Sequence, residues 1–299
     1  MPGLQGPDLA RRLRAVRPAS GRPRAVEPAW TVTSSDDVTL AGYELGGEGD
    51  VMLISHATGL CALMYRRLAD LLTEHFRVVT FDYRGHGRST TPATTDALAW
   101  QRIAHDTAAV RARLGDGPVH AFGHSMGGAC LLLAERAQPG SFASLFLFEP
   151  IVFPEGHVDG QNTLAEGARR RRAEFPSRAD VLARYATKPP YDGILAGCLA
   201  DYVEHGFADV DDGVRLRCDP VVESTVFANG SGSTVAGLDA VAVPTVVAAG
   251  RPPGAAELSP FVAAALPQAQ FTDYPQLDHF GPFQDPFTLA AAITAHARA

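Results

Sequence analysis

Short, almost continuous apolar runs alternate along the chain with longer segments in which leucine and alanine recur at helical spacing. A continuous apolar run is typical of a strand buried on both faces, and helical spacing is typical of a helix with one buried face. Strands that alternate with helices predict a mainly parallel sheet with helices on both of its faces. The predicted strands span 30–35, 38–45, 51–56, 77–83, 117–122, 144–150, 244–250 and 269–275. The predicted core helices span about 60–75, 98–114, 129–137 and 255–265, with one more at the C-terminus.

This alternation is interrupted between residues 151 and 236, where helix signals follow one another without clear strands. The stretches "TLAE" (163–166) and "SRAD" (177–180) resemble capping boxes that open helices. A third helix is predicted from about 192 to 205, with Gly206 as its C-cap. The pattern therefore indicates a helical segment inserted into the alternating core.

Four consecutive arginines, Arg169 to Arg172, lie in this insertion. We interpret them as a solvated helix face rather than as a substrate-recognition element. The predicted organisation is a core of residues 29–150 and 237–299, a helical cap of residues 151–236, and a separate N-terminal arm of residues 1–28.

The N-terminal arm differs from the rest of the chain in its composition. It is rich in arginine and proline and has little apolar periodicity, which favours an extended, solvated conformation. Such a basic arm is also able to contact a neighbouring subunit, so the sequence is compatible with a homo-oligomer as well as with a monomer. Its arginines are Arg11, Arg12, Arg14, Arg17, Arg22 and Arg24.

Composition excludes several classes of function. The net charge of −7 gives no sign of a nucleic-acid binder. No apolar run approaches the roughly 18 residues that a membrane span requires, and the N-terminus lacks the apolar region of a secretory signal. The four cysteines are scattered without C-x-x-C spacing, so neither a disulfide framework nor a zinc site is indicated. We therefore expect a cytoplasmic protein with reduced cysteines.

The stretch "FGHSMGG" (122–128) is the clearest chemical signal in the sequence. Gly123-His124-Ser125-Met126-Gly127 fits the pattern G-x-S-x-G between a predicted strand and a predicted helix. At such a sharp turn the serine hydroxyl points out of the sheet, and the glycines leave room for the neighbouring backbone. The N-terminus of the following helix supplies N–H groups and partial positive charge for a developing oxyanion. Ser125 is therefore the candidate nucleophile.

Three further motifs complete a resemblance to the α/β-hydrolase superfamily, which covers residues from about 30 to 299. They are "SHATG" (55–59), "FDYRGHGRS" (81–89) and "LDHFGPFQDP" (277–286). The resemblance implies an oxyanion hole formed by the backbone N–H groups of Thr58 and Met126, and it implies no metal or organic cofactor. It also implies that "FDYRGHGRS" is a structural turn. Of the ten histidines, only His279 follows the final strand and precedes a helix, and it is the candidate base.

The acidic member of the expected triad departs from the common pattern of that superfamily. The loop after the seventh strand reads "AAGRPPGAAE", with prolines where many relatives have an aspartate. Glu149 ends the apolar run "SLFLFEP", and a carboxylate there needs a partner to offset its desolvation. Some relatives take their acid from this position. We favour Glu149 and keep Glu257 as the alternative.

A serine nucleophile disfavours the alkyl-enzyme chemistry of epoxide hydrolases and haloalkane dehalogenases, and fits acyl transfer to water. The expected function is hydrolysis of a carboxylic ester or lactone of a small to medium apolar substrate. Two alternatives stay open: a C–C bond hydrolase of ring-cleavage diketones, and a non-enzymatic small-molecule receptor. The candidate substrate-binding residues are Leu60, Ile151, Phe153, Tyr191, Tyr202 and Phe280.

Overall fold

The computed structural model describes residues 26–157 and 162–299. Most of the predicted N-terminal arm lies outside these residues. Within them, eight strands form one sheet in the order β1-β2-β4-β3-β5-β6-β10-β11. β1 pairs with β2, and β2 with β4, in antiparallel orientation. All other neighbouring strands of this sheet pair in parallel. The strands are β1 (Trp30–Thr33), β2 (Thr39–Gly46), β3 (Val51–Ser55), β4 (Arg77–Phe81), β5 (Val119–His124), β6 (Ser144–Phe148), β10 (Thr245–Ala249) and β11 (Ala269–Asp273).

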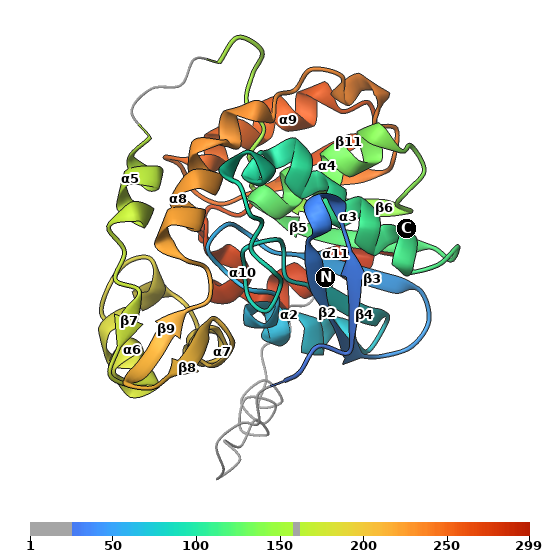
Figure 1. The fold of residues 1–299 in the computed structure, drawn as a ribbon. Coiled ribbons are helices and arrows are strands. Elements are labelled where there is room, and N and C mark those ends of the chain that lie inside the picture. The colour runs from blue at the N-terminus through green and yellow to red at the C-terminus, as the bar shows by residue number, and fades with distance from the viewer. Residues whose placement is uncertain (1–25, 158–161) are drawn as a thin grey trace.

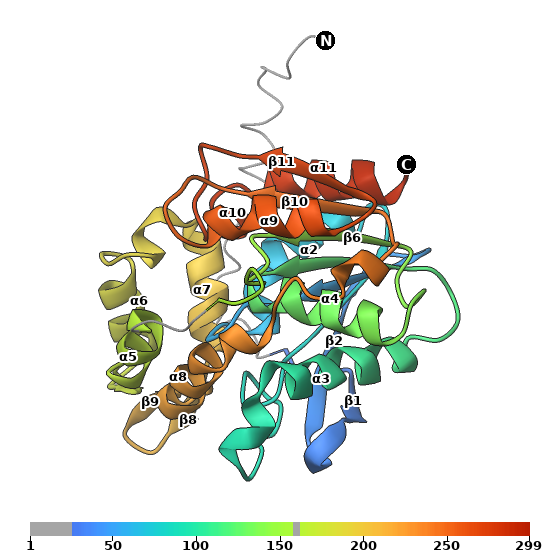
Figure 2. The ribbon, with the colours of Figure 1, turned by 90° about the horizontal axis from the view of Figure 1, so that it is seen from above.

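Helices cover both faces of this sheet, and each face buries its own apolar cluster (Figures 1 and 2). Helices α3, α4 and α9 pack on one face, while α2 and α11 pack on the other. The predicted fold class is confirmed. The core helices are α2 (Arg66–Leu72), α3 (Trp100–Arg113), α4 (Met126–Ala137), α9 (Ser259–Ala265), α10 (Gly281–Gln284) and α11 (Pro286–Ala297). Single 3-10 turns are η1 (Ser35–Asp37), η2 (Ala62–Tyr65), η3 (Thr95–Leu98), η5 (Gly230–Gly232), η6 (Leu238–Ala240) and η7 (Ala255–Leu258).

The segment between β6 and β10, which we call the inserted segment (residues 151–236), gathers at one side of the core in both views (Figures 1 and 2). The sequence predicts a helical segment here, but three short strands also form a second sheet in the order β7-β9-β8. Its elements are α5 (Thr163–Arg169), β7 (Glu174–Phe175), α6 (Arg178–Tyr185), η4 (Tyr191–Gly193), α7 (Ala196–His205), β8 (Phe207–Val210), β9 (Gly213–Leu216) and α8 (Pro220–Ala228).

Two predicted helix starts in the inserted segment need correction. The N-cap of α5 is Asn162, whose side chain accepts a hydrogen bond from the backbone N–H of Ala165 at 2.9 Å. Thr163 is therefore the first helical residue and not the cap. The third helix begins at Ala196 rather than near residue 192, because a separate 3-10 turn precedes it. Ser177 does cap α6, and Gly206 follows α7, as predicted.

Candidate active site

Ser125 occupies the sharp turn between β5 and α4. Its φ of 56° and ψ of −120° are strained for a residue with a side chain, and such conformations persist where the surrounding structure enforces them. A Cβ at Gly127 would lie 2.3 Å from the carbonyl oxygen of Ser55, and one at Gly123 would lie 2.6 Å from the Cα of Gly128. The glycines of the motif are therefore required by close backbone approaches, and the turn holds Ser125 at the carboxyl end of the sheet.

Glu149 directly follows β6 and also has a positive φ, of 46°. Its side chain is buried, with 1% of the residue exposed. One carboxylate oxygen, Oε2, lies 2.6 Å from Nδ1 of His279, and the other, Oε1, accepts the backbone N–H of Gly250 at 2.8 Å. Both oxygens therefore have a donor, which offsets the cost of burying this carboxylate.

The loop after β10 contributes a backbone donor to this arrangement instead of an acid. Gly250 ends the run that forms β10, and β10 pairs with β6, so its N–H faces the carboxylate of Glu149. The alternative acid, Glu257, is exposed and accepts the backbone N–H of Gly254 at 3.2 Å as a helix cap. Of the two acids that the sequence leaves open, the structure brings Glu149 to His279.

His124, beside the nucleophile, holds the loop that carries His279. Its Nε2 donates to the backbone carbonyl of His279 at 2.7 Å, and its Nδ1 accepts the hydroxyl of Tyr65 at 2.7 Å. The carbonyl can only accept, so Nε2 must carry the proton. Burial holds the pKa of His124 well below its ordinary value, with a smaller contribution from His279. A neutral His124 thus fixes the backbone of His279, a contact that the position next to Ser125 alone does not reveal.

The loop after β3 lies against the start of α4. Within the described residues, the backbone N–H groups of Thr58 and Met126 have no protein acceptor. The neighbouring Gly59 is held from two sides: its N–H donates to Nε2 of His86 at 3.0 Å, and its carbonyl accepts the hydroxyl of Tyr202 at 3.0 Å. The loop is therefore fixed both by the core and by the inserted segment.

The "FDYRGHGRS" stretch is a structural turn, as expected. The carboxylate of Asp82 accepts hydrogen bonds from the Tyr43 hydroxyl at 2.7 Å and from the backbone N–H groups of Ala62 at 2.8 Å and Arg88 at 2.9 Å. Arg84 is fully buried and pairs with Asp106 at 2.6 Å. These contacts tie the turn to β2, to η2 and to α3.

The predicted solvated face of arginines is wrong for Arg171. Its side chain is 15% exposed and pairs with the carboxylate of Glu223 at 2.8 Å. Its guanidinium also donates to the hydroxyls of Tyr185 at 3.3 Å, Tyr191 at 3.0 Å and Tyr202 at 2.5 Å. α5 ends at Arg169, so the chain beyond it turns Arg171 inward. Neither this arginine nor Glu223 was identified as a site residue from the sequence.

The six candidate substrate-binding residues do not form one group. Tyr191 and Tyr202 stack with ring centroids 5.4 Å apart, and the ring of Phe280 lies 5.7 Å from that of Tyr191. Phe153 instead stacks on His157 at 4.2 Å. Leu60 belongs to the same apolar cluster as Tyr202, whereas Ile151 packs against the cluster on the other face of the sheet.

Comparisons with known proteins agree on the fold. A family model described as the alpha/beta hydrolase fold matches residues 50–191. A crystal structure of E-2-(acetamidomethylene)succinate hydrolase superimposes with a TM-score of 0.76 at 22% identity, over 90% of this chain and 98% of that one.

Two sequence relatives match over shorter regions. Protein phosphatase methylesterase 1 of Mus musculus is 32% identical over 200 residues, which cover 61% of this chain and 50% of the relative. A Mycobacterium tuberculosis protein named "Probable oxidoreductase EphD" is 33% identical over 107 residues, or 35% of this chain and 18% of that protein. The chain thus aligns with half or less of the length of these two relatives. The family model, which matches a little under half of the chain, and the structural match at 22% identity together show that this chain has the alpha/beta hydrolase fold.

Proposed function

We propose that this protein is a serine hydrolase that cleaves a carboxylic ester or lactone of small to medium size through an acyl-enzyme. The observation that carries the proposal is the contact of 2.6 Å between Glu149 and Nδ1 of His279, on a loop that His124 holds beside Ser125. Strained backbone at both Ser125 and Glu149 supports it, because such strain clusters at functional sites.

In the proposed mechanism, Glu149 accepts the Nδ1–H of His279 and thereby leaves Nε2 free to take the proton of Ser125. Ser125 attacks the carbonyl carbon, and the free N–H groups of Thr58 and Met126 donate to the oxyanion. His279 then returns the proton to the leaving oxygen. Water, activated in turn by His279, hydrolyses the acyl-enzyme and restores Ser125.

We further propose that the inserted segment acts as a cap over this site, on a core of residues 29–150 and 237–299. Its support is the hydrogen bond from Tyr202 of α7 to the carbonyl of Gly59, next to the proposed oxyanion donor. A cap in this position excludes water and limits which substrates reach Ser125. The relative named as a methylesterase favours ester chemistry, although it aligns over only part of its length.

The test is a hydrolysis screen with aryl esters, aliphatic esters and lactones of increasing ring size, combined with a serine-directed phosphonate. We expect the phosphonate to label Ser125 and to abolish turnover, and Ser125→Ala to lower kcat by about 10⁴- to 10⁶-fold with an unchanged fold. The Ser125→Ala protein treated with the same phosphonate is the control. Labelling of another residue, or an active alanine variant, would overturn the proposal.

A further inference from the structure

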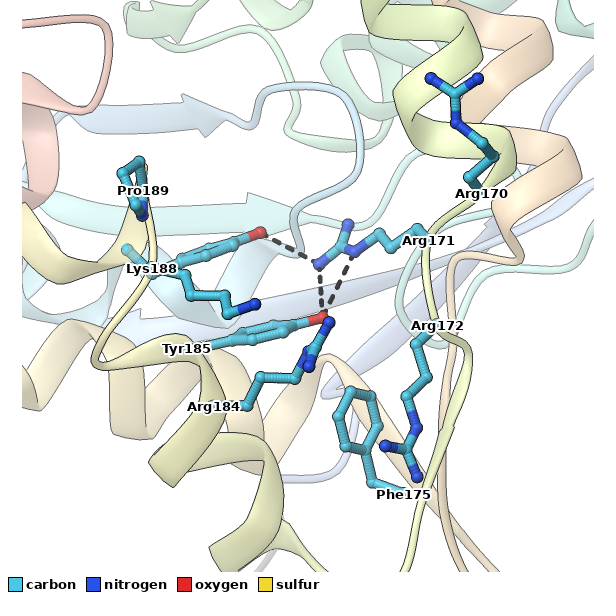
Figure 3. Close-up of a pocket in the computed structure, with 9 residues that line it drawn as sticks. Arg170, Arg171, Arg172, Phe175, Arg184, Tyr185, Lys188 and Pro189 are labelled. Atoms are coloured by element: carbon cyan, nitrogen blue, oxygen red, sulfur yellow. Dashed lines mark hydrogen bonds between the residues drawn. The ribbon is translucent and has the colours of Figure 1, made fainter.

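A pocket of about 190 Å³ opens in the inserted segment between the end of α5, helix α6 and the turn at η4 (Figure 3). This volume is below the roughly 300–1,000 Å³ of pockets that enclose a whole drug-sized ligand, so the pocket suits one group of a larger molecule. Its lining is unusual in charge, since five of its nine residues are cationic: Arg170, Arg171, Arg172, Arg184 and Lys188, with Phe175, Tyr185, Pro189 and Tyr191.

Most of this positive charge is not neutralised by the protein. Arg171 pairs with Glu223, and Arg170 lies 3.8 Å from Glu166 at the exposed rim. Among the described residues, neither Arg184 nor Lys188 has a carboxylate within ion-pair distance. The pocket therefore holds at least two cations without a counter-ion.

Like charges around one small pocket repel each other, and because Arg184 and Lys188 are exposed, solvent screens this repulsion while both groups stay accessible to an anion. This cluster of positive charge contrasts with the chain as a whole, which carries a net charge of −7. In Figure 3 the Lys188 and Arg184 side chains point toward the guanidinium of Arg171, whereas Arg170 points away. Guanidinium groups match the geometry of carboxylate and phosphate oxygens, so the pocket favours an anionic ligand.

A layer of tyrosines lies between the pocket and the proposed reaction centre. Tyr191 lines the pocket, and its ring lies 5.7 Å from that of Phe280, the residue after His279. Arg171 also lines it and donates to Tyr202, whose hydroxyl bonds the loop of Thr58. These contacts place the pocket one layer of aromatic side chains away from the loops that carry His279 and Thr58.

We propose that this pocket binds the anionic end of the substrate, a carboxylate or a phosphate separated from the scissile bond by an apolar chain. The inference rests on the proposed hydrolase function for the identity of the molecule, but the binding of an anion can be measured without any hydrolysis. Arg184 and Lys188 supply the unpaired charge, and Arg171 is held in place by Glu223.

The first experiment uses the fact that Lys188 is the only lysine of the sequence. The protein is acetylated with a low concentration of an amine-reactive ester, and modification of Lys188 and of the N-terminal amine is followed by peptide mass spectrometry. Inorganic phosphate and succinate are compared with sodium chloride at equal ionic strength. We expect phosphate or succinate to slow the acetylation of Lys188 about fivefold and to leave the acetylation of the N-terminal amine unchanged. The anion that protects Lys188 shows whether the pocket binds a phosphate or a carboxylate. Equal acetylation rates in all three salts would overturn the proposal.

The second experiment compares paired substrates on the full-length protein. One pair consists of a neutral aryl ester and the same ester with a terminal carboxylate; the other consists of a neutral aliphatic ester and the same ester with a terminal phosphate. Arg184→Ala and Lys188→Ala should each raise KM for the anionic member about five- to tenfold, as expected for loss of roughly 1 to 1.4 kcal/mol, and change the neutral member less than twofold.

Arg169→Ala is the matched control, because this arginine belongs to the same run but does not line the pocket, and it should change neither member. Equal loss on neutral and anionic substrates would overturn the anionic pocket. If no ester or lactone is hydrolysed by the wild-type protein, the proposed function fails, while the acetylation result still decides whether the pocket binds an anion.

Discussion

Replacement of Glu149 by glutamine tests the proposed triad most directly. The two carboxylate oxygens face two donors, Nδ1–H of His279 and the N–H of Gly250. An amide has only one oxygen. If that oxygen accepts from Gly250, the amide NH₂ faces Nδ1, which must lose its proton and accept. The ring of His279 then carries its proton on Nε2, where it can no longer remove the proton of Ser125.

The expected loss follows from this change of tautomer and from the lost negative charge beside the imidazolium. In a serine triad the equivalent amide substitution lowers kcat by about 10⁴-fold, which corresponds to roughly 5.5 kcal/mol of transition-state stabilisation. Because Glu149 is buried and does not reach the substrate in the proposed mechanism, KM should change by less than about threefold. Glutamine has nearly the same volume, so the fold should persist.

The assay is steady-state hydrolysis of the best ester from the screen, with kcat and KM determined separately and the fold checked by circular dichroism. Glu257→Gln is the matched control: its carboxylate only caps the backbone N–H of Gly254, so kcat should fall at most a few-fold. A large loss for Glu257→Gln with little loss for Glu149→Gln would refute the assignment of the acid, while Ser125 and His279 could keep their roles.

Two further predictions concern stability. Arg171→Met leaves the buried Glu223 without its partner and should lower the free energy of unfolding by about 3–5 kcal/mol in urea titrations, whereas Arg171→Met with Glu223→Gln should recover part of that loss. An equally large loss in the double variant would contradict this explanation. Burial lowers the pKa of His56 and of His86 from 6.5 to about 4, so between these values the unfolded chain binds protons that the folded protein does not. This contribution to the free energy of unfolding is complete above pH 6.5 and is lost as the pH falls toward 4. At about 1.4 kcal/mol per unit of pKa shift, the loss is roughly 3 kcal/mol for each histidine. Urea unfolding from pH 7.5 to 4.5 measures it, and a flat free energy over this range would count against neutral burial.

The sequence by itself determined the fold class and the positions of the serine and histidine. The central strands of the main sheet each coincide with an apolar run, and the periodicity of a strand is a local property of the chain. The turn around Ser125 can also be recognised locally, because the G-x-S-x-G spacing lies within five consecutive residues, although the close approach that requires Gly127 is to the carbonyl of Ser55 on β3. Local patterns of this kind can be read without knowing which strands are neighbours.

The inserted segment was less predictable for the opposite reason. Its helix caps are local signals, and Ser177 was identified correctly. Its second sheet was missed because the short strands β7 and β9 pair residues far apart in the chain, such as Glu174 with Arg215. A two-residue strand carries too little periodicity to be recognised before its partner is known.

Only the tertiary structure decided which acid meets His279 and which arginine is buried. Glu149 has its second donor, Gly250, because β6 and β10 are neighbours in the sheet although 101 positions separate the two residues. Arg171 is one of four consecutive arginines, and its burial depends on Glu223 and on tyrosines from α6, η4 and α7. The electrostatic environment of a side chain is set by groups distant in sequence, and a local pattern cannot specify them.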